Sequence, residues 1–198
     1  MAIMLTTVEA VKTQLGITGT ADDDRIEFYI RAVSATIENY CKRQFSEQDY
    51  EHTFQPTYTD HIFAEEYPVR EITKVTYGEE ELDPADYSFE NGGIFKTEGT
   101  WNRETTIEYT AGYVLPGDED LTATPPIVRD LPYDLEAAAI FYATINYNTT
   151  NSAGIKSEQV DVLRVQYGDG NVVGGKVLPL PATVMAMVNP YRHGGRLA

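Results

Sequence analysis

The chain has 198 residues, of which 15 are Lys or Arg and 31 are Asp or Glu, and its formal charge at pH 7 is −16. Its 42% hydrophobic and 11% aromatic residues exclude a disordered acidic chain and predict a folded protein of one domain, or of one domain with an insertion. The acidic excess excludes tight binding of nucleic acid, because neutralising phosphates needs clustered Lys and Arg.

Two helices are predicted at the N-terminus. Thr6 and Glu9 have the spacing of a capping box, apolar residues follow at helical intervals, and Gly16 stands where the helix would end. The acidic run 22–24 would cap a second helix and complement its positive end. The apolar stripe of this second helix consists of Ile26, Tyr29, Ile30, Val33, Ile37, Tyr40 and Cys41.

From about Glu47 the helical period gives way to short runs rich in Thr, Tyr, Val and Ile between Pro and Gly residues, which is typical of strands. The sequence Asn91-Gly92-Gly93 indicates the turn of a hairpin. The predicted strands are 50–54, 61–63, 72–77, 87–89, 94–96 and 105–110. Together they predict a small antiparallel β unit.

A polar loop with several prolines follows the β unit, and a third helix is expected to start near Asp130 with Pro132 in its first turn. Further on, Leu163, Val165 and Tyr167 alternate with polar residues, which predicts a strand or hairpin arm that ends at 168–170. A last short helix is predicted from Pro181 to Asn189.

These elements predict an α+β fold. A small helical core of about four helices would comprise residues 1–45 and 130–198. An antiparallel β insertion at 47–112 would lie between the second and third helices, and residues 113–129 would form the connecting loop.

Residues for catalysis or metal binding show no recognisable pattern. His52 and His61 lie nine residues apart, His193 is distant from both, and Cys41 is the single cysteine, so no zinc site or cofactor is expected. With 31 acidic residues, no carboxylate pair can be singled out for glycoside hydrolysis. The sequence predicts a protein that is not an enzyme.

The single cysteine also predicts folding in a reducing compartment, the cytoplasm, since no internal disulfide can form. The N-terminus lacks the basic and apolar regions of a signal peptide. The longest uncharged run, 137–155, contains Asn, Thr and Ser residues that would be costly in lipid, so no membrane span is expected.

Charge is distributed unevenly along the chain. No acidic residue follows Asp169, so the last 29 residues carry +3 and the preceding ones −19. The last helix is apolar and is followed by a basic, aromatic tail, a combination suited to docking into an acidic or apolar groove. A packing helix with a frayed end would show the same pattern.

The order of these features resembles the head-to-tail connector, or adaptor, proteins of long-tailed double-stranded-DNA bacteriophages. The resemblance covers nearly the whole chain, but the β unit is larger than in the compact helical members. The matching segments are Leu5 to Lys12, Ile37 to Tyr40, Tyr67-Pro68-Val69, Ile72 to Val75, Ile107 to Tyr113, Leu131 to Leu135, Lys156-Ser157-Glu158 and Asn189 to Arg192.

This resemblance implies a structural protein of the virion, made in the host cytoplasm. About a dozen copies would form a ring below the portal protein at the head–tail junction, extend the DNA channel and offer a platform to the next connector or tail-completion protein. DNA would pass without specific binding. The C-terminal segment would dock on the portal, with Val184, Met185, Val188, Tyr191 and Arg192 as the docking residues.

Three alternatives remain open from the sequence. The first is a head-closure or tail-completion protein, which the β content favours slightly. The second is an acidic hydrolase that uses carboxylates of the β unit, and the third is a soluble binding module of a bacterial cell.

Overall fold

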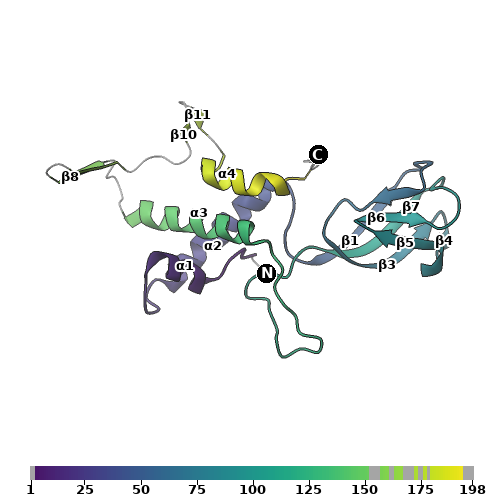
Figure 1. Ribbon diagram of the computed structural model, residues 1–198, viewed down its shortest axis with the longest axis horizontal. Coiled ribbons are helices and arrows are strands. Elements are labelled where there is room, and N and C mark those ends of the chain that lie inside the picture. The colour runs from purple at the N-terminus through teal and green to yellow at the C-terminus, as the bar shows by residue number, and fades with distance from the viewer. Residues whose placement is uncertain are drawn as a thin grey trace. The chain divides into compact units, whose positions relative to one another are not determined.

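The structure, a computed structural model, describes residues 3–151, 157–160, 163–166, 172–173, 176–177 and 179–193. The chain divides into two compact units: a helical unit of Met1–Arg43 with Leu115–Ala198, and a β unit of Gln44–Val114 (Figure 1). As predicted, the fold is α+β, and the strands of the β unit lie between the second and third helices in the chain.

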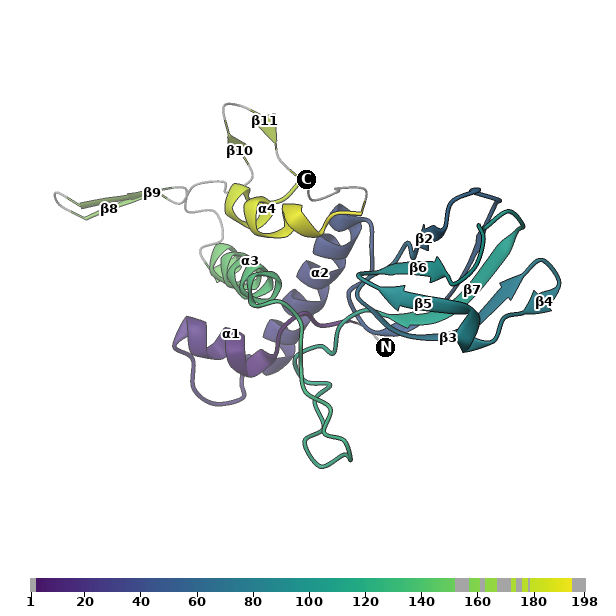
Figure 2. The same ribbon diagram turned by 45° about the vertical axis from the view of Figure 1, so that its right-hand side comes forward.

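Four α-helices build the described part of the helical unit. They are α1 (Val8–Leu15), α2 (Asp23–Cys41), α3 (Tyr133–Asn151) and α4 (Ala182–Val188), and a 3₁₀ turn, η2 (Asn189–Tyr191), follows α4. Helix α3 contacts the other three helices (Figure 2). The fully buried side chains between them include Ile26, Ile30, Ile37, Leu135, Ala138, Ala139, Ala143, Val184 and Val188.

The helix ends differ in detail from the prediction. Thr7, not Thr6, caps α1, because its side chain accepts a hydrogen bond from the Ala10 amide at 3.2 Å, while Thr6 is buried. Asp22 occupies the N-cap of α2 but makes no side-chain cap hydrogen bond. Pro132 precedes α3 and contributes its carbonyl to the first turn instead of lying inside the helix.

A partly exposed ion pair joins the first two helices. The Lys12 ammonium lies 2.9 Å from Asp23 and 3.8 Å from Glu9. The hydrogen bond to Asp23 raises the pKa of Lys12. The acidic start of α2 therefore holds α1 in place, in addition to complementing the helix dipole.

Two sheets make up the β unit. The first has the order β1 (Gln48–Phe54), β7 (Thr105–Ala111), β3 (Val69–Tyr77) and β4 (Glu80–Glu81), and the second has β2 (His61–Phe63), β6 (Gly93–Lys96) and β5 (Tyr87–Glu90). All pairs within them are antiparallel. The six predicted strands are confirmed, each extended by no more than a few residues.

Side chains from both sheets share one core. The fully buried Trp101 packs edge-on against Tyr77, with ring centroids 5.8 Å apart, and its indole N–H donates to the Asp60 carbonyl at 3.2 Å. Tyr109 is also buried, and burial raises its pKa to about 12. The buried members of this core are Ile62, Val75, Tyr77, Ile94, Trp101, Ile107, Tyr109 and Ala111.

Short strands occur between α3 and α4. Strand β8 (Ser157–Val160) pairs with β9 (Leu163–Gln166), and β10 (Val172–Val173) pairs with β11 (Lys176–Val177), both antiparallel. The hairpin arm predicted around Leu163 is thus confirmed for 163–166. Its predicted end at 168–170 lies outside the described residues.

Candidate interaction surfaces

The C-terminal segment lies against its own helical unit. Helix α4 packs on α3, and Val184 and Val188 are fully buried there. Met185 and Tyr191 are half-buried, whereas Arg192 is exposed. The five predicted docking residues are thus near one another in the chain, but only three of them reach the surface.

Hydrogen bonds fix the end of this segment as a strap, residues 189–193. The Tyr191 hydroxyl lies 2.7 and 2.9 Å from the two carboxylate oxygens of Asp134. The Tyr40 hydroxyl donates to Asn189 at 2.6 Å, and the His193 amide donates to the Cys41 carbonyl at 2.8 Å. The basic, aromatic tail is therefore held to α2 and α3 as far as His193.

Cys41 lies at the end of α2, and its carbonyl accepts the hydrogen bond from the strap. Its thiol is buried and lies 3.7 Å from the Val188 carbonyl, and burial raises its pKa from 9.0 to about 11. A thiol reagent at pH 7 should therefore react with folded protein at least about a hundredfold more slowly than with unfolded protein, because the thiolate is the reactive form. The absorbance change of the reagent over time, with and without urea, measures the two reaction rates. Equal rates would show that the Cys41 thiol is not buried in the folded protein.

An acidic face covers one side of the larger sheet. Residues directly opposite in the β1–β7 register share a face, which places Glu51 beside Glu108 and Asp49 beside Thr110. Thr110 donates to Asp49 at 2.7 Å, and Lys74 lies 3.6 Å from Glu108. We call this set, Asp49, Glu51, Thr53, Thr106, Glu108 and Thr110, the acidic face.

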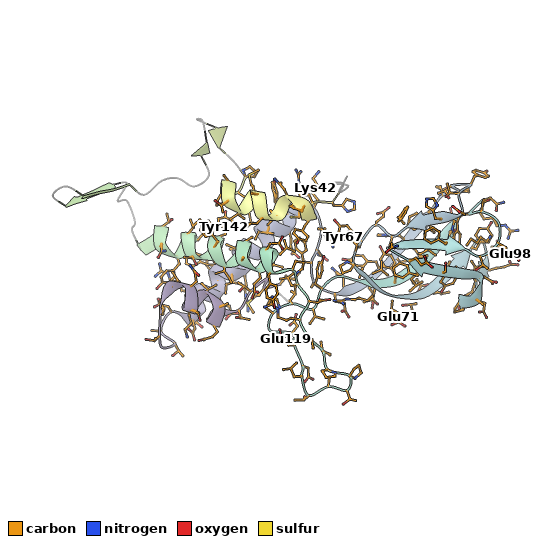
Figure 3. The ribbon with its side chains drawn as sticks, viewed as in Figure 1. Lys42, Tyr67, Glu71, Glu98, Glu119 and Tyr142 are labelled. Carbon is orange, nitrogen blue, oxygen red and sulfur yellow. The ribbon has the colours of Figure 1, made fainter. Side chains whose placement is uncertain are left out.

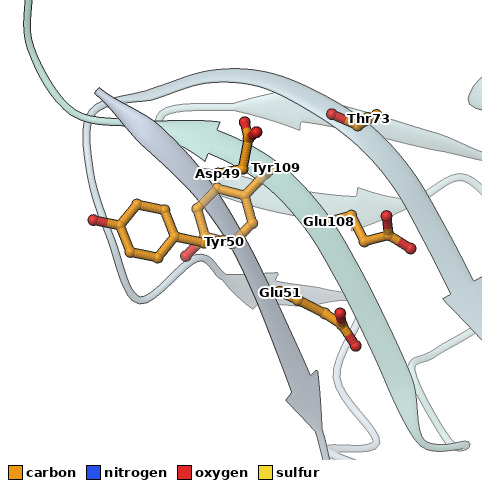
Figure 4. A pocket seen from close by; sticks show the side chains of 6 residues that line it. All are labelled: Asp49, Tyr50, Glu51, Thr73, Glu108 and Tyr109. Carbon is orange, nitrogen blue, oxygen red and sulfur yellow. The ribbon is translucent and has the colours of Figure 1, made fainter. Parts of the chain in front are cut away.

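A shallow hollow of about 290 Å³ lies on these strands (Figure 4). Asp49 and Glu51 of β1 are exposed, and Glu108 of β7 is half-exposed. A general acid requires a carboxyl group that is shielded from water, and none of the lining carboxylates is shielded in this way. The lining residues are Asp49, Tyr50, Glu51, Thr73, Glu108 and Tyr109.

The pair of Glu51 and Glu108 places like charges directly opposite each other, which destabilises the sheet. Replacing Glu51 with Lys should raise the free energy of unfolding of the β unit by about 0.5 kcal/mol. Urea unfolding followed by the fluorescence of Trp101 measures the change, and Glu51→Gln should give a smaller gain. A loss of stability in both variants would contradict the assignment of this pair to one face.

The two histidines of the β unit each lie beside one polar side chain. His52 Nδ1 lies 3.0 Å from the Tyr109 hydroxyl, and His61 Nδ1 lies 2.7 Å from Asp60. Within the described ranges, no group of three or more potential ligands could hold a metal ion. None of the described helices has both the length and the apolar character that crossing a bilayer requires.

The fold is shared with chains of assembled particles. A chain in the neck of an empty GTA particle, computed with C6 symmetry, matches with a TM-score of 0.53 and 16% identity over 93% of this chain and 88% of that one. A chain in the virion of a native gene transfer agent (GTA) particle matches with a TM-score of 0.53 and 18% identity over the same shares. At this identity, the likeness shows a common fold.

A family model described as head completion protein matches residues 4–193. The chain therefore belongs to the head completion protein family, and it is a structural component of a virion with a role in the region between head and tail. The comparison with curated proteins gives no match. The resemblance to phage connectors, inferred from the order of features along the sequence, is confirmed at the level of the family.

Proposed function

We propose that this protein forms a ring of about a dozen copies below the portal, extends the DNA channel and joins the phage head to the tail. Family membership over residues 4–193 is the observation that carries this proposal. A closed ring needs two different contact surfaces on each copy, because its neighbours meet head to tail.

The acidic face suits a position near DNA. It presents Asp49, Glu51 and Glu108 on adjacent strands, with Lys74 as a neighbouring cation. Such a surface repels phosphates, so DNA can slide past without being gripped. In this proposal the acidic body of the chain faces the channel, and the acid-free C-terminal segment makes the attachment.

Burial limits which residues can dock on the portal. Val184 and Val188 hold α4 in the helical unit, so the contact falls to Met185, Tyr191 and Arg192. The Arg192 guanidinium lies 4.9 Å from the centre of the Tyr40 ring and remains exposed, available to a carboxylate of a partner. The portal surface that receives it would be acidic or apolar.

Deleting residues 189–198 tests the docking role. The truncated protein loses the strap contacts but keeps α4, so it should fold and fail to join portal-containing heads. Because the strap also contributes to stability, Arg192→Glu provides a second variant that leaves the described hydrogen bonds of the strap in place. Normal head joining by both variants would reject docking through this segment.

The head-closure or tail-completion role is the alternative within the same structural class. Binding to a tail tube in the absence of portal would favour it. The hydrolase alternative would have to use the hollow of the β unit, where Glu108 lies near Lys74, Asp49 accepts from Thr110, and water reaches the carboxylates. This geometry gives no support to acid catalysis.

A further inference from the structure

The loop between β7 and α3 contains an ordered arm, residues 117–128. Asp120 and Ile127 pair across it, with backbone hydrogen bonds of 2.9 and 3.0 Å in both directions. The Asp120 carboxylate accepts from the amide and the hydroxyl of Thr122 at 2.9 and 2.6 Å, which lowers its pKa. The arm is therefore folded by its own contacts.

A clasp fixes the base of the arm to α3. Arg129 donates to Glu136 at 2.6 Å and lies 3.9 Å from Glu119, and its guanidinium lies 4.8 Å from the centre of the Tyr133 ring. Glu119, labelled in Figure 3, thus joins the arm to the start of the helix. Preorganisation of this kind lowers the entropy lost when a loop binds a partner.

The arm holds apolar side chains in water. Leu121 is 67% exposed, Val128 57% and Ile127 43%. In Figures 1 and 2 the arm runs away from the helices of its own unit and returns to them. An ordered loop that exposes several apolar side chains is typical of an interaction site.

Charge indicates which partner the arm fits. Asp118, Glu119 and Asp120 stand beside the apolar residues, and the nearby Arg129 is already paired. A groove that accepts the arm should therefore be apolar and bordered by Lys or Arg. A second copy has a net charge of −16, and its acid-free C-terminal segment is assigned to the portal, so the better match is a different protein.

We propose that the arm docks into a basic, apolar groove of the component that follows this protein on the tail side. This inference rests on the proposed function and identifies the surface on which the next component would dock. The portal would be held by the strap and the next component by the arm. Both are anchored at the start of α3, the strap through Tyr191 on Asp134 and the arm through Arg129 on Glu136.

The test uses the full-length chain, purified heads that lack it, and purified tails of the same phage. Leu121→Glu combined with Val128→Glu should bind heads as the wild type does, yet reduce joined particles counted by electron microscopy about tenfold or more. The matched control, Leu121→Met with Val128→Ile, keeps the apolar surface and should join normally. Higher salt should weaken wild-type joining.

Normal joining by the double Glu variant would overturn the inference. Loss of head binding by that variant would also overturn it, because the arm would then serve contacts between copies or with the portal. If the wild type itself fails to bind heads, the proposed function fails, and the inference fails with it. Thermal unfolding of each variant shows whether the exposed substitutions leave the fold intact.

Discussion

Replacing Gly112 with Ala should destabilise the β unit by about 3 kcal/mol or more. Gly112 follows β7 with φ at +118°, a conformation that L residues rarely adopt. A Cβ at this position would lie 2.4 Å from the Ser46 carbonyl oxygen and 2.8 Å from the Glu47 Cα. These are backbone atoms, so the clash cannot be relieved by rotating a side chain.

Gly99→Ala is the matched control. Gly99 has φ at +80°, but a Cβ there would meet nothing within 4 Å, so only the conformational cost of about 1–2 kcal/mol applies. Urea unfolding followed by the single tryptophan, Trp101, reports on both variants because it is buried in the same unit. Equal losses in the two variants would show that Gly112 does not lie against the 46–47 backbone.

Replacing Val188 with Asp should unfold α4 from the helical unit, at a cost of about 3 kcal/mol or more. Val188 is fully buried, and its carbonyl lies 3.7 Å from the Cys41 thiol. An aspartate there would be ionised without a partner. Circular dichroism during thermal unfolding measures the loss, and the Cys41 thiol should become reactive at the same time.

Met185→Asp separates folding from docking. Met185 lies on the same helix but is half-exposed, so its substitution should leave the melting temperature within a few degrees of the wild type while weakening attachment to portal-containing heads. A stable Val188→Asp variant that fails to attach would instead mean that Val188 contacts the partner directly. The two substitutions thus distinguish a packing role from a contact role.

Strands and turns of the β unit were predictable because local signals dominate there. Asn91, with φ at 51°, and Gly92, with φ at 79°, adopt the positive φ values that a tight hairpin turn requires, and the alternation of Thr105–Ala111 matches its alternate burial. The second helix was predictable because its apolar stripe repeats over nearly twenty residues.

The accessibility of the C-terminal residues was not predictable. An apolar stripe such as that of Val184 and Val188 has the same pattern whether the helix packs on its own chain or on a partner. The structure decides this by placing α4 against α3. The strap was missed for a similar reason, since the contact of Tyr191 with Asp134 joins residues 57 positions apart.

The arm was predicted only as a polar loop. Its acidic and proline residues are typical of a polar loop, and Leu121 is separated in sequence from Ile127 and Val128, so the three show no period. The pairing of Asp120 with Ile127 and the exposure of these apolar side chains appear only in the folded chain. The start of the first helix shows the same limit on a smaller scale. Thr6 and Thr7 are both residue types that cap helices, and only the structure shows that Thr6 is buried and Thr7 is the cap.

Electron microscopy of the full-length protein mixed with purified portal-containing heads tests the central claim most directly. The proposed function predicts a closed ring of density on the portal axis, at the exit of the DNA channel. Arg192→Glu should reduce the fraction of heads that carry this ring, and Met185→Asp should act in the same direction. Heads without axial density, or a protein bound only to tail tubes, would contradict the proposal.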